Sequence, residues 1–287
     1  QHYTEHPILK TTKLAGRKFP RPTASTHPPC YRPKHGMSHW KLTHDYDGNP
    51  YHGWQVQPAL STIQGTLASP LHHITGETVL PQGSGRTDAG VHALAQVATV
   101  SLATPIPPAN LLRALNRCLP PSIRVLSTEH VPPRFHARHS ALSKTYQYRI
   151  FPLRTFPQIR VPHSSRPHRD EWFEATEDAV ETPDRICPPT LAPYVWPCPW
   201  PLSLDSLNRA AIHIAGAHDF TTFAAVDPDL TDRTESDDTP QPSIRTIHHS
   251  AWTRHDDLLL YTVTGSGFLH HMVRNLVGTF VQAGAGR

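Results

Sequence analysis

A single carboxylate, Asp88, lies in a glycine-rich string between two segments typical of strands. The string reads Gly83-Ser84-Gly85-Arg86-Thr87-Asp88-Ala89-Gly90-Val91-His92-Ala93. On a tight turn between strands, a charged side chain is held by a rigid scaffold and presented to a ligand. There a carboxylate can act as a nucleophile or as a base. A plain hairpin, in which the aspartate only stabilises the turn, fits the same residues. A phosphate loop does not, because no Gly-Lys-Ser/Thr follows.

A second group of polar side chains lies near the carboxyl end, in the string GFLHHMVRNLVG. Its apolar residues recur at helical spacing and predict a helix over Phe268–Gln282. His271, Arg274 and Gly278 follow at spacings of three and four, so they share another face of that helix. We expect Arg274 to point inward beside a small residue that allows close approach. A solvated helix arginine is the alternative.

Histidine is frequent, with 22 residues, so a metal-dependent enzyme has to be weighed. Three adjacent pairs occur, His72-His73, His248-His249 and His270-His271. Adjacent side chains point apart on a helix or strand. The sequence also has no H-E-x-x-H motif and no clustered Cys/His spacing. We therefore expect no metal ion at the site.

Composition and charge favour an intracellular protein. The four cysteines, Cys30, Cys118, Cys187 and Cys198, are scattered, which favours reduced thiols. No apolar run reaches the roughly 18 residues of a membrane span, and no signal peptide is apparent. The net charge is +4, but residues 1–37 carry +6 and the remainder carries −2. From Arg113 to Arg169 there are eleven basic residues and one acidic residue, which suits a phosphate backbone or a solvated surface.

Hydrophobic periodicity predicts strands and helices on both sides of Asp88. Residues 1–37 show no sustained pattern, and we expect disorder there. A helix opens at Thr62–Leu67, and Pro70 should bend or end it, because proline inside a helix costs about 3 kcal/mol. Further helices are expected at Ala109–Leu119 and Ser203–Gly216, and strands at Trp40–Tyr46, Ile123–Val131, Lys144–Ile150, Ile244–Arg254 and Leu258–Thr264.

Several strings resemble, in order, the motifs of the TruA family of tRNA pseudouridine synthases. GSGRTDAGVHALAQV resembles the active-site motif of that family. The others are YDGNPYHGWQVQP, FHAR, KTYQY, GAHDFTTF and GFLHHMVRNLVG. The resemblance implies two α+β domains, each a mainly antiparallel sheet with helices on one face, and an active-site cleft between them.

The resemblance also implies which residues carry the reaction. Asp88 matches the catalytic aspartate, Tyr146 the tyrosine that meets the target base, and Arg274 the arginine that pairs with the aspartate. Arg86 would fill the space of a flipped uridine or hold a phosphate. The other residues expected to bind RNA are Thr87, His92, Arg138, Lys144, His271 and Asn275.

The activity implied is the isomerisation of uridine to pseudouridine in the anticodon stem-loop of tRNA, at tRNA positions 38, 39 and 40. Uracil is detached from ribose, rotated and rejoined through carbon. The reaction consumes neither an oxidant nor water, so it needs no cofactor. The resemblance further implies a cytoplasmic homodimer with tRNA as its partner and no membrane contact.

We expect three parts in the chain. These are a disordered leader over 1–37, interpreted as an upstream extension ahead of Met37, an N-terminal domain over 38–141 and a C-terminal domain over 142–287. The last part holds an insertion at 153–186. Family members continue with a further helix and strand beyond Arg287. Val277, Phe280 and Val281 are therefore expected to lack cover, and a homologue that binds RNA with little or no activity is the alternative function.

Overall fold

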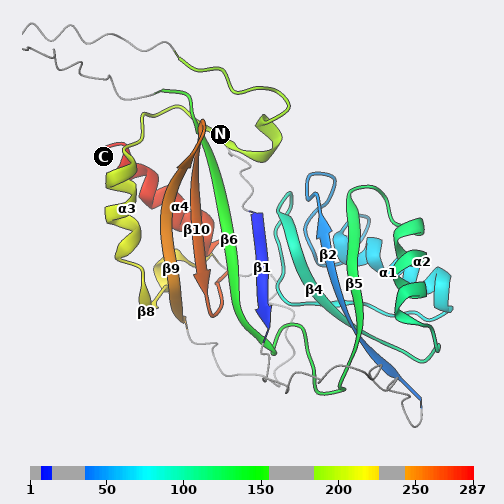
Figure 1. Cartoon of the computed structure of the whole chain (residues 1–287). Helices are drawn as coiled ribbons and strands as arrows, with labels where there is room; N and C mark the ends of the chain where they lie inside the picture. Colours follow the sequence, from blue (N-terminus) through cyan, green and yellow to red (C-terminus); the bar gives the residue numbers. More distant parts are fainter. Residues whose placement is uncertain (1–7, 15–35, 155–183, 226–242) are drawn as a thin grey trace, which may run out of the picture.

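The computed structural model describes residues 8–14, 36–154, 184–225 and 243–287, and residues 8–14 by their backbone alone. Ten strands form a sheet in the order β5-β2-β4-β1-β6-β10-β9-β8, with β3 beside β4 and β7 beside β6 (Figure 1). The strands are β1 (Ile8–Leu14), β2 (Ser38–Tyr46), β3 (Gln82–Gly83), β4 (His92–Leu102), β5 (Ile123–Val131), β6 (Ala141–Pro152), β7 (Trp196–Cys198), β8 (Gly216–Asp219), β9 (Ile244–His255) and β10 (Leu258–Gly265). The helices are α1 (Ile63–Thr75), α2 (Pro108–Cys118), α3 (Leu204–Ile212) and α4 (Met272–Gly284), with short 3-10 turns η1 (Ala192–Tyr194) and η2 (Thr221–Phe223).

The N-terminal half pairs β2 antiparallel with both β4 and β5. Alternate residues of β2 are buried, among them Trp40 and Leu42, as expected for a strand with one face against a core. Helices α1 and α2 lie beside these strands (Figure 1) and bury Leu67, Leu71 and Leu115 in the same core. The α+β class and the antiparallel half-sheet predicted for this domain are confirmed.

The C-terminal half pairs β6 with β10, β10 with β9 and β9 with β8, all antiparallel. Helices α3 and α4 lie beside β9 and β10 (Figure 1). Contrary to the expectation from the sequence, Val277, Phe280 and Val281 of α4 are buried. The Phe280 ring lies edge-on to the rings of Trp252 and Tyr261, so the sheet itself covers this helix face.

The two half-sheets are joined by β1, which lies in the segment expected to be disordered. Ile8 pairs in parallel with His92 of β4 and antiparallel with Gln147 of β6. The expectation was wrong for residues 8–14, because hydrophobic pattern does not reveal a strand whose main bonds are to two unpaired sheet edges. Residues 1–7 and 15–35 lie outside the described part.

Two further expectations concern Pro70 in α1 and the insertion expected at 153–186. Helix α1 begins at the Thr62 cap and continues through Pro70 to Thr75, so Pro70 does not end it. Pro70 is buried, and this packing offsets the bond that its missing N–H cannot make. The ends of the expected insertion at 153–186 meet, since Arg154 Nε lies 2.8 Å from Asp184 Oδ1, while residues 155–183 lie outside the description. None of the described helices combines the length and apolarity needed to cross a membrane.

Candidate active site

A cleft of about 1210 Å³ lies between the two half-sheets, with Asp88 on its wall. The N-terminal half contributes the glycine-rich turn, and the C-terminal half contributes Tyr146 of β6 and the segment 268–274. Among the residues that line the cleft, Asp88 is the one carboxylate. Four lining side chains are basic, Arg86, Arg138, Lys144 and Arg274. The cleft therefore holds a single carboxylate within a positively charged lining that attracts anions.

Backbone bonds to two other segments hold the turn that carries Asp88. The Trp54 N–H donates to the Thr87 carbonyl at 2.9 Å, and the Val91 N–H donates to the Asp88 carbonyl at 3.1 Å. The Gln96 side chain on β4 donates from its Nε2 to the Gly85 carbonyl at 2.8 Å. Because the carbonyls of Gly85, Thr87 and Asp88 all accept hydrogen bonds, the turn holds Asp88 in a fixed position.

The glycines of the turn serve mainly to allow close approach. Of Gly83, Gly85 and Gly90, only Gly90 has a left-handed backbone, with φ 75°. A Cβ at Gly83 would lie 2.7 Å from the Trp54 ring, and one at Gly85 would lie 2.9 Å from Lys144 Nζ. Gly83 therefore needs glycine because an aromatic ring from elsewhere occupies the space, whereas the atom near Gly85 is the end of a flexible side chain that can move.

Two histidines face the carboxylate. His271 Nε2 lies 3.4 Å from Asp88 Oδ2, and His270 Nε2 lies 3.7 Å from Asp88 Oδ1. The two imidazole rings are 3.9 Å apart. The expectation that adjacent histidines point apart was wrong here because α4 begins at Met272, not Phe268, and His271 is left-handed with φ 56°. This conformation costs on the order of 1–3 kcal/mol and turns both rings toward Asp88.

The pKa of His271 depends on its position in the wall of the cleft. Burial is the largest influence and lowers the pKa of His271 below its ordinary 6.5. The Asp88 charge raises that pKa, while His270 and Arg274 lower it. The net lowering leaves His271 as a neutral imidazole at neutral pH, so it meets Asp88 without a charge of its own.

Arg274 lies in the first turn of α4 and lines the cleft, as expected. It forms no ion pair with Asp88, whose partners within 4.0 Å in the described residues are the two histidines. Its Nε is buried and has no hydrogen-bond partner among the described residues. Gly278 does not explain the approach of Arg274, since a Cβ there would meet nothing within 4 Å.

Tyr146 forms the wall of the cleft beside Phe268. The two rings meet edge to face with centroids 4.9 Å apart. Burial raises the pKa of Tyr146 well above its ordinary 10, and the nearby Asp88 charge raises it further. The phenol therefore stays neutral and offers a flat apolar face, which is suited to stacking on a base.

Lys144, on the same strand, is partly buried behind Gly85. Burial, followed by the charges of Arg138 and Arg245, lowers the pKa of Lys144 from 10.5 to about 8. Arg86 and Arg138 line the cleft with exposed side chains. These three cations form one basic wall, as expected for residues that contact phosphates.

Three of the expected RNA-binding residues have structural contacts. Thr87 lines the cleft, but its hydroxyl bonds the Tyr46 hydroxyl at 2.9 Å. His92 is buried outside the cleft, and its Nδ1 accepts the Gly48 N–H at 3.1 Å. Asn275 donates to the Phe223 carbonyl at 2.9 Å and does not line the cleft. The structure brings the other seven expected site residues together at the cleft.

Sequence reasoning missed His270 and Phe268 as site residues. Both stand in the string FLHH directly before α4, in which a binding role was expected for His271 alone. A helix was expected to run through them, which would have sent the two rings to different faces. The preceding Gly265-Ser266-Gly267 was the available sign that the helix begins later.

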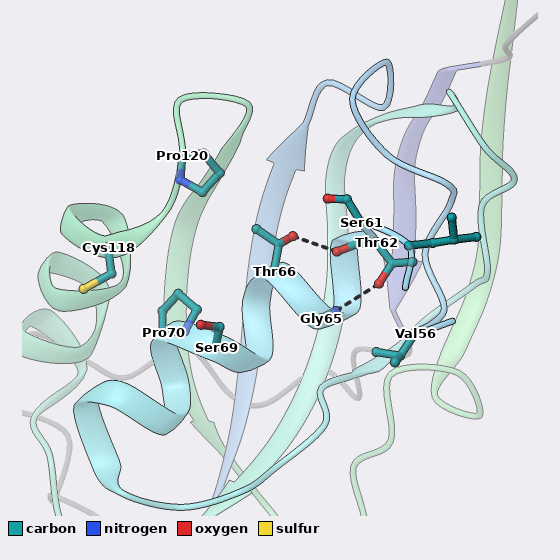
Figure 2. A pocket seen from close by; sticks show the side chains of 10 residues that line it. Val56, Ser61, Thr62, Gly65, Thr66, Ser69, Pro70, Cys118 and Pro120 are labelled. Carbon is teal, nitrogen blue, oxygen red and sulfur yellow. Dashed lines mark hydrogen bonds between the residues drawn. The ribbon is translucent and has the colours of Figure 1, made fainter. Parts of the chain in front are cut away.

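A second hollow of about 380 Å³ lies between α1 and α2 (Figure 2). Its lining includes Thr62, Thr66, Pro70 and Cys118, and it shares only Val56 and Leu60 with the cleft. The Cys118 thiol is the one titratable group in this lining. The hollow therefore offers no acid–base pair, and the chemistry belongs to the cleft.

The chain is similar to known proteins over most of its length. A family model described as tRNA pseudouridine synthase matches residues 42–140 and 210–287. A tRNA pseudouridine synthase A from Solibacter usitatus is 45% identical over 241 residues, which cover 84% of this chain and 85% of the relative. The protein of that name from Maridesulfovibrio salexigens is 35% identical over 88% of this chain and 78% of its own length. The one from Geobacillus sp. is 34% identical, with coverages of 86% and 84%.

Proposed function

The chain belongs to the TruA family of tRNA pseudouridine synthases, and we propose that Asp88 is the catalytic carboxylate with which it isomerises uridines of the tRNA anticodon stem-loop. One observation carries the assignment of the residue. Asp88 is the one carboxylate among the residues that line a cleft with four basic side chains. Its turn is also bonded on both sides, which suits a group that must be presented to a ribose or a base.

The reaction balances without a co-reactant. The bond from uracil N1 to ribose C1′ breaks, the base rotates, and a bond from uracil C5 to C1′ forms. The proton lost from C5 is matched by the proton gained at N1. Asp88 acts on the ribose, either as a nucleophile at C1′ or as a base. Its carboxylate is ionised in both routes.

The cleft walls have separate tasks in this proposal. The target uridine has to leave the stacked RNA at a cost of a few kcal/mol. Tyr146 stacks on the extruded base, and Phe268 supports the Tyr146 ring edge-on. Arg86, Arg138 and Lys144 contact phosphates beside it. Arg274 pairs with Asp88 or with a phosphate once RNA is bound, which satisfies its buried Nε.

We also infer a cytoplasmic homodimer that acts on tRNA. The family resemblance supports both, and the tRNA substrate follows the names of the relatives. Two of the described cysteines, Cys118 and Cys187, are free, in keeping with reduced thiols. Sedimentation of the full chain, with and without tRNA, tests the dimer.

The decisive test replaces Asp88 by asparagine, which keeps the shape and removes the charge. Pseudouridine is mapped in tRNA after incubation with Asp88→Asn and with a matched control, Asp256→Asn. Asp256 is exposed and left-handed with φ 50°, a conformation that asparagine accepts. We expect no turnover but retained tRNA binding for Asp88→Asn, and parental turnover for the control. Turnover of Asp88→Asn within tenfold of the parent would exclude Asp88.

A further inference from the structure

We propose that Asp88, His270 and His271 form a binding site for a single Zn²⁺ ion, and that zinc bound there blocks the enzyme. Each of the three offers one ligand atom, and these atoms all lie within 4.8 Å of one another. The proposed reaction uses Asp88 but requires no metal ion. The ion acts as an inhibitor that occupies the catalytic carboxylate.

Each histidine Nε2 lies nearest a different oxygen of Asp88, and both distances are longer than a good hydrogen bond. His271 Nε2 and His270 Nε2 lie 3.4 and 3.7 Å from the two oxygens of Asp88. Good N–H···O bonds are shorter, at about 2.7–3.2 Å. Around a tetrahedral zinc ion with ligands at about 2.0–2.1 Å, neighbouring ligand atoms are about 3.3–3.4 Å apart. One ligand atom from each residue lies within 4.8 Å of the other two, so side-chain rotations that draw these atoms closer together would enclose the ion.

The backbone prepares the two imidazoles. The left-handed conformation of His271, with φ 56°, places both rings on the Asp88 side, 3.9 Å apart. Met272 then begins α4, whose buried residues fix the segment. The three ligands come from two chain segments held independently, so most of the ordering has occurred before an ion arrives.

The donor set selects the metal. Two imidazole nitrogens and one carboxylate oxygen suit Zn²⁺, whereas Mg²⁺ prefers oxygen ligands alone. Three protein ligands leave the fourth position open to water, as in zinc sites that exchange a ligand. The side chains are one quarter to about one third exposed, so solvent reaches the site.

The charges around the site affect both the affinity for zinc and the competition between zinc and tRNA. Arg86 and Arg274 also line the cleft and oppose a dication. Coordination engages the Asp88 carboxylate, which then cannot act on ribose. Because the three ligands line the cleft that is proposed to receive the target nucleotide, we expect tRNA and the ion to exclude one another.

Binding is measured directly on the full chain, by titrating Zn²⁺ against a fluorescent zinc chelator. The variants are Asp88→Asn and His270→Gln/His271→Asn, the second of which keeps a residue suited to the left-handed backbone. The control is His248→Gln/His249→Gln, an adjacent exposed pair on β9 with no acid beside it among the described contacts. Circular dichroism establishes that each variant is folded.

We expect one zinc ion whose affinity falls at least about tenfold in both site variants and is unchanged in the control. Mg²⁺ should not compete, tRNA should, and a chelator should restore turnover to zinc-treated enzyme. Equal zinc affinity in the parent and in both folded site variants would overturn the proposal. If one site variant does not fold, the other decides. Because zinc is measured without turnover, a failure here leaves the role of Asp88 in catalysis to its own test.

Discussion

Arg274 and Asp88 line the same cleft without forming an ion pair, although the family resemblance pairs them. The carboxylate faces two histidines, while the Nε of Arg274 is buried without a hydrogen-bond partner among the described residues. A buried donor without a partner costs about 1–3 kcal/mol. We therefore expect the Arg274 guanidinium to gain its partner when RNA binds.

We predict opposite effects of Arg274 variants on stability and on turnover. Arg274→Leu should keep or raise the free energy of unfolding, because it removes an unsatisfied donor. Arg274→Lys should lower kcat about a hundredfold or more, because it keeps the charge but loses the Nε–H. Urea unfolding and single-turnover kinetics measure the two quantities. A lysine variant with nearly parental kcat would mean that charge alone suffices.

Lys144 should make tRNA affinity depend on pH. Burial lowers its pKa from 10.5 to about 8, so its charge is present at pH 7 and mostly lost at pH 9. Parental affinity should therefore fall between pH 7 and pH 9. Lys144→Arg should bind equally at both values, and Lys144→Met should bind weakly at both. Filter binding at constant ionic strength measures this, and an equal fall in the arginine variant would assign it to another group.

Lys144 should also make the free energy of unfolding depend on pH. Between about pH 8 and pH 10.5 the unfolded chain holds the Lys144 proton and the folded chain does not, so the free energy of unfolding rises with pH in that window. Lys144→Met should lack this contribution. Below pH 8 it should be more stable than the parent.

Gly53 and Gly278 form a matched pair of alanine substitutions. Gly53 is left-handed with φ 88°, and a Cβ there would lie 2.7 Å from the Thr87 carbonyl oxygen. Gly53→Ala should cost at least about 1–3 kcal/mol and disturb the Asp88 turn. A Cβ at Gly278 meets nothing within 4 Å, and Gly278→Ala should stabilise α4 by about 0.5–1 kcal/mol. Thermal unfolding of both variants tests this, and equal melting temperatures would contradict it.

Elements with local signals were predictable from the sequence. The strand Ile123–Val131 was predicted with its observed ends, and the helix expected at Ala109–Leu119 is observed at Pro108–Cys118. Their signals, alternation in one case and two prolines before an apolar stripe in the other, lie within the segments themselves. The motif resemblance likewise located Asp88, Tyr146 and Arg274 at one cleft.

What could not be predicted depends on distant contacts. The need for glycine at Gly83 comes from the Trp54 ring, which is distant in sequence. The late start of α4 places both His270 and His271 on Asp88, and no periodicity in FLHH encodes the sign of one φ angle. Strand β1 was missed because its partners, β4 and β6, belong to different domains.

The pairing of β1 with both β4 and β6 limits how the enzyme can accept its substrate. Rotating one half-sheet against the other would break those bonds, so the spacing between the Asp88 turn and Tyr146 stays nearly constant. A cleft of constant width cannot close around a nucleotide, so the RNA has to change its conformation to enter it. We therefore expect selection among uridines to depend on the free energy needed to bend and unstack each RNA loop, which requires no contact with neighbouring bases.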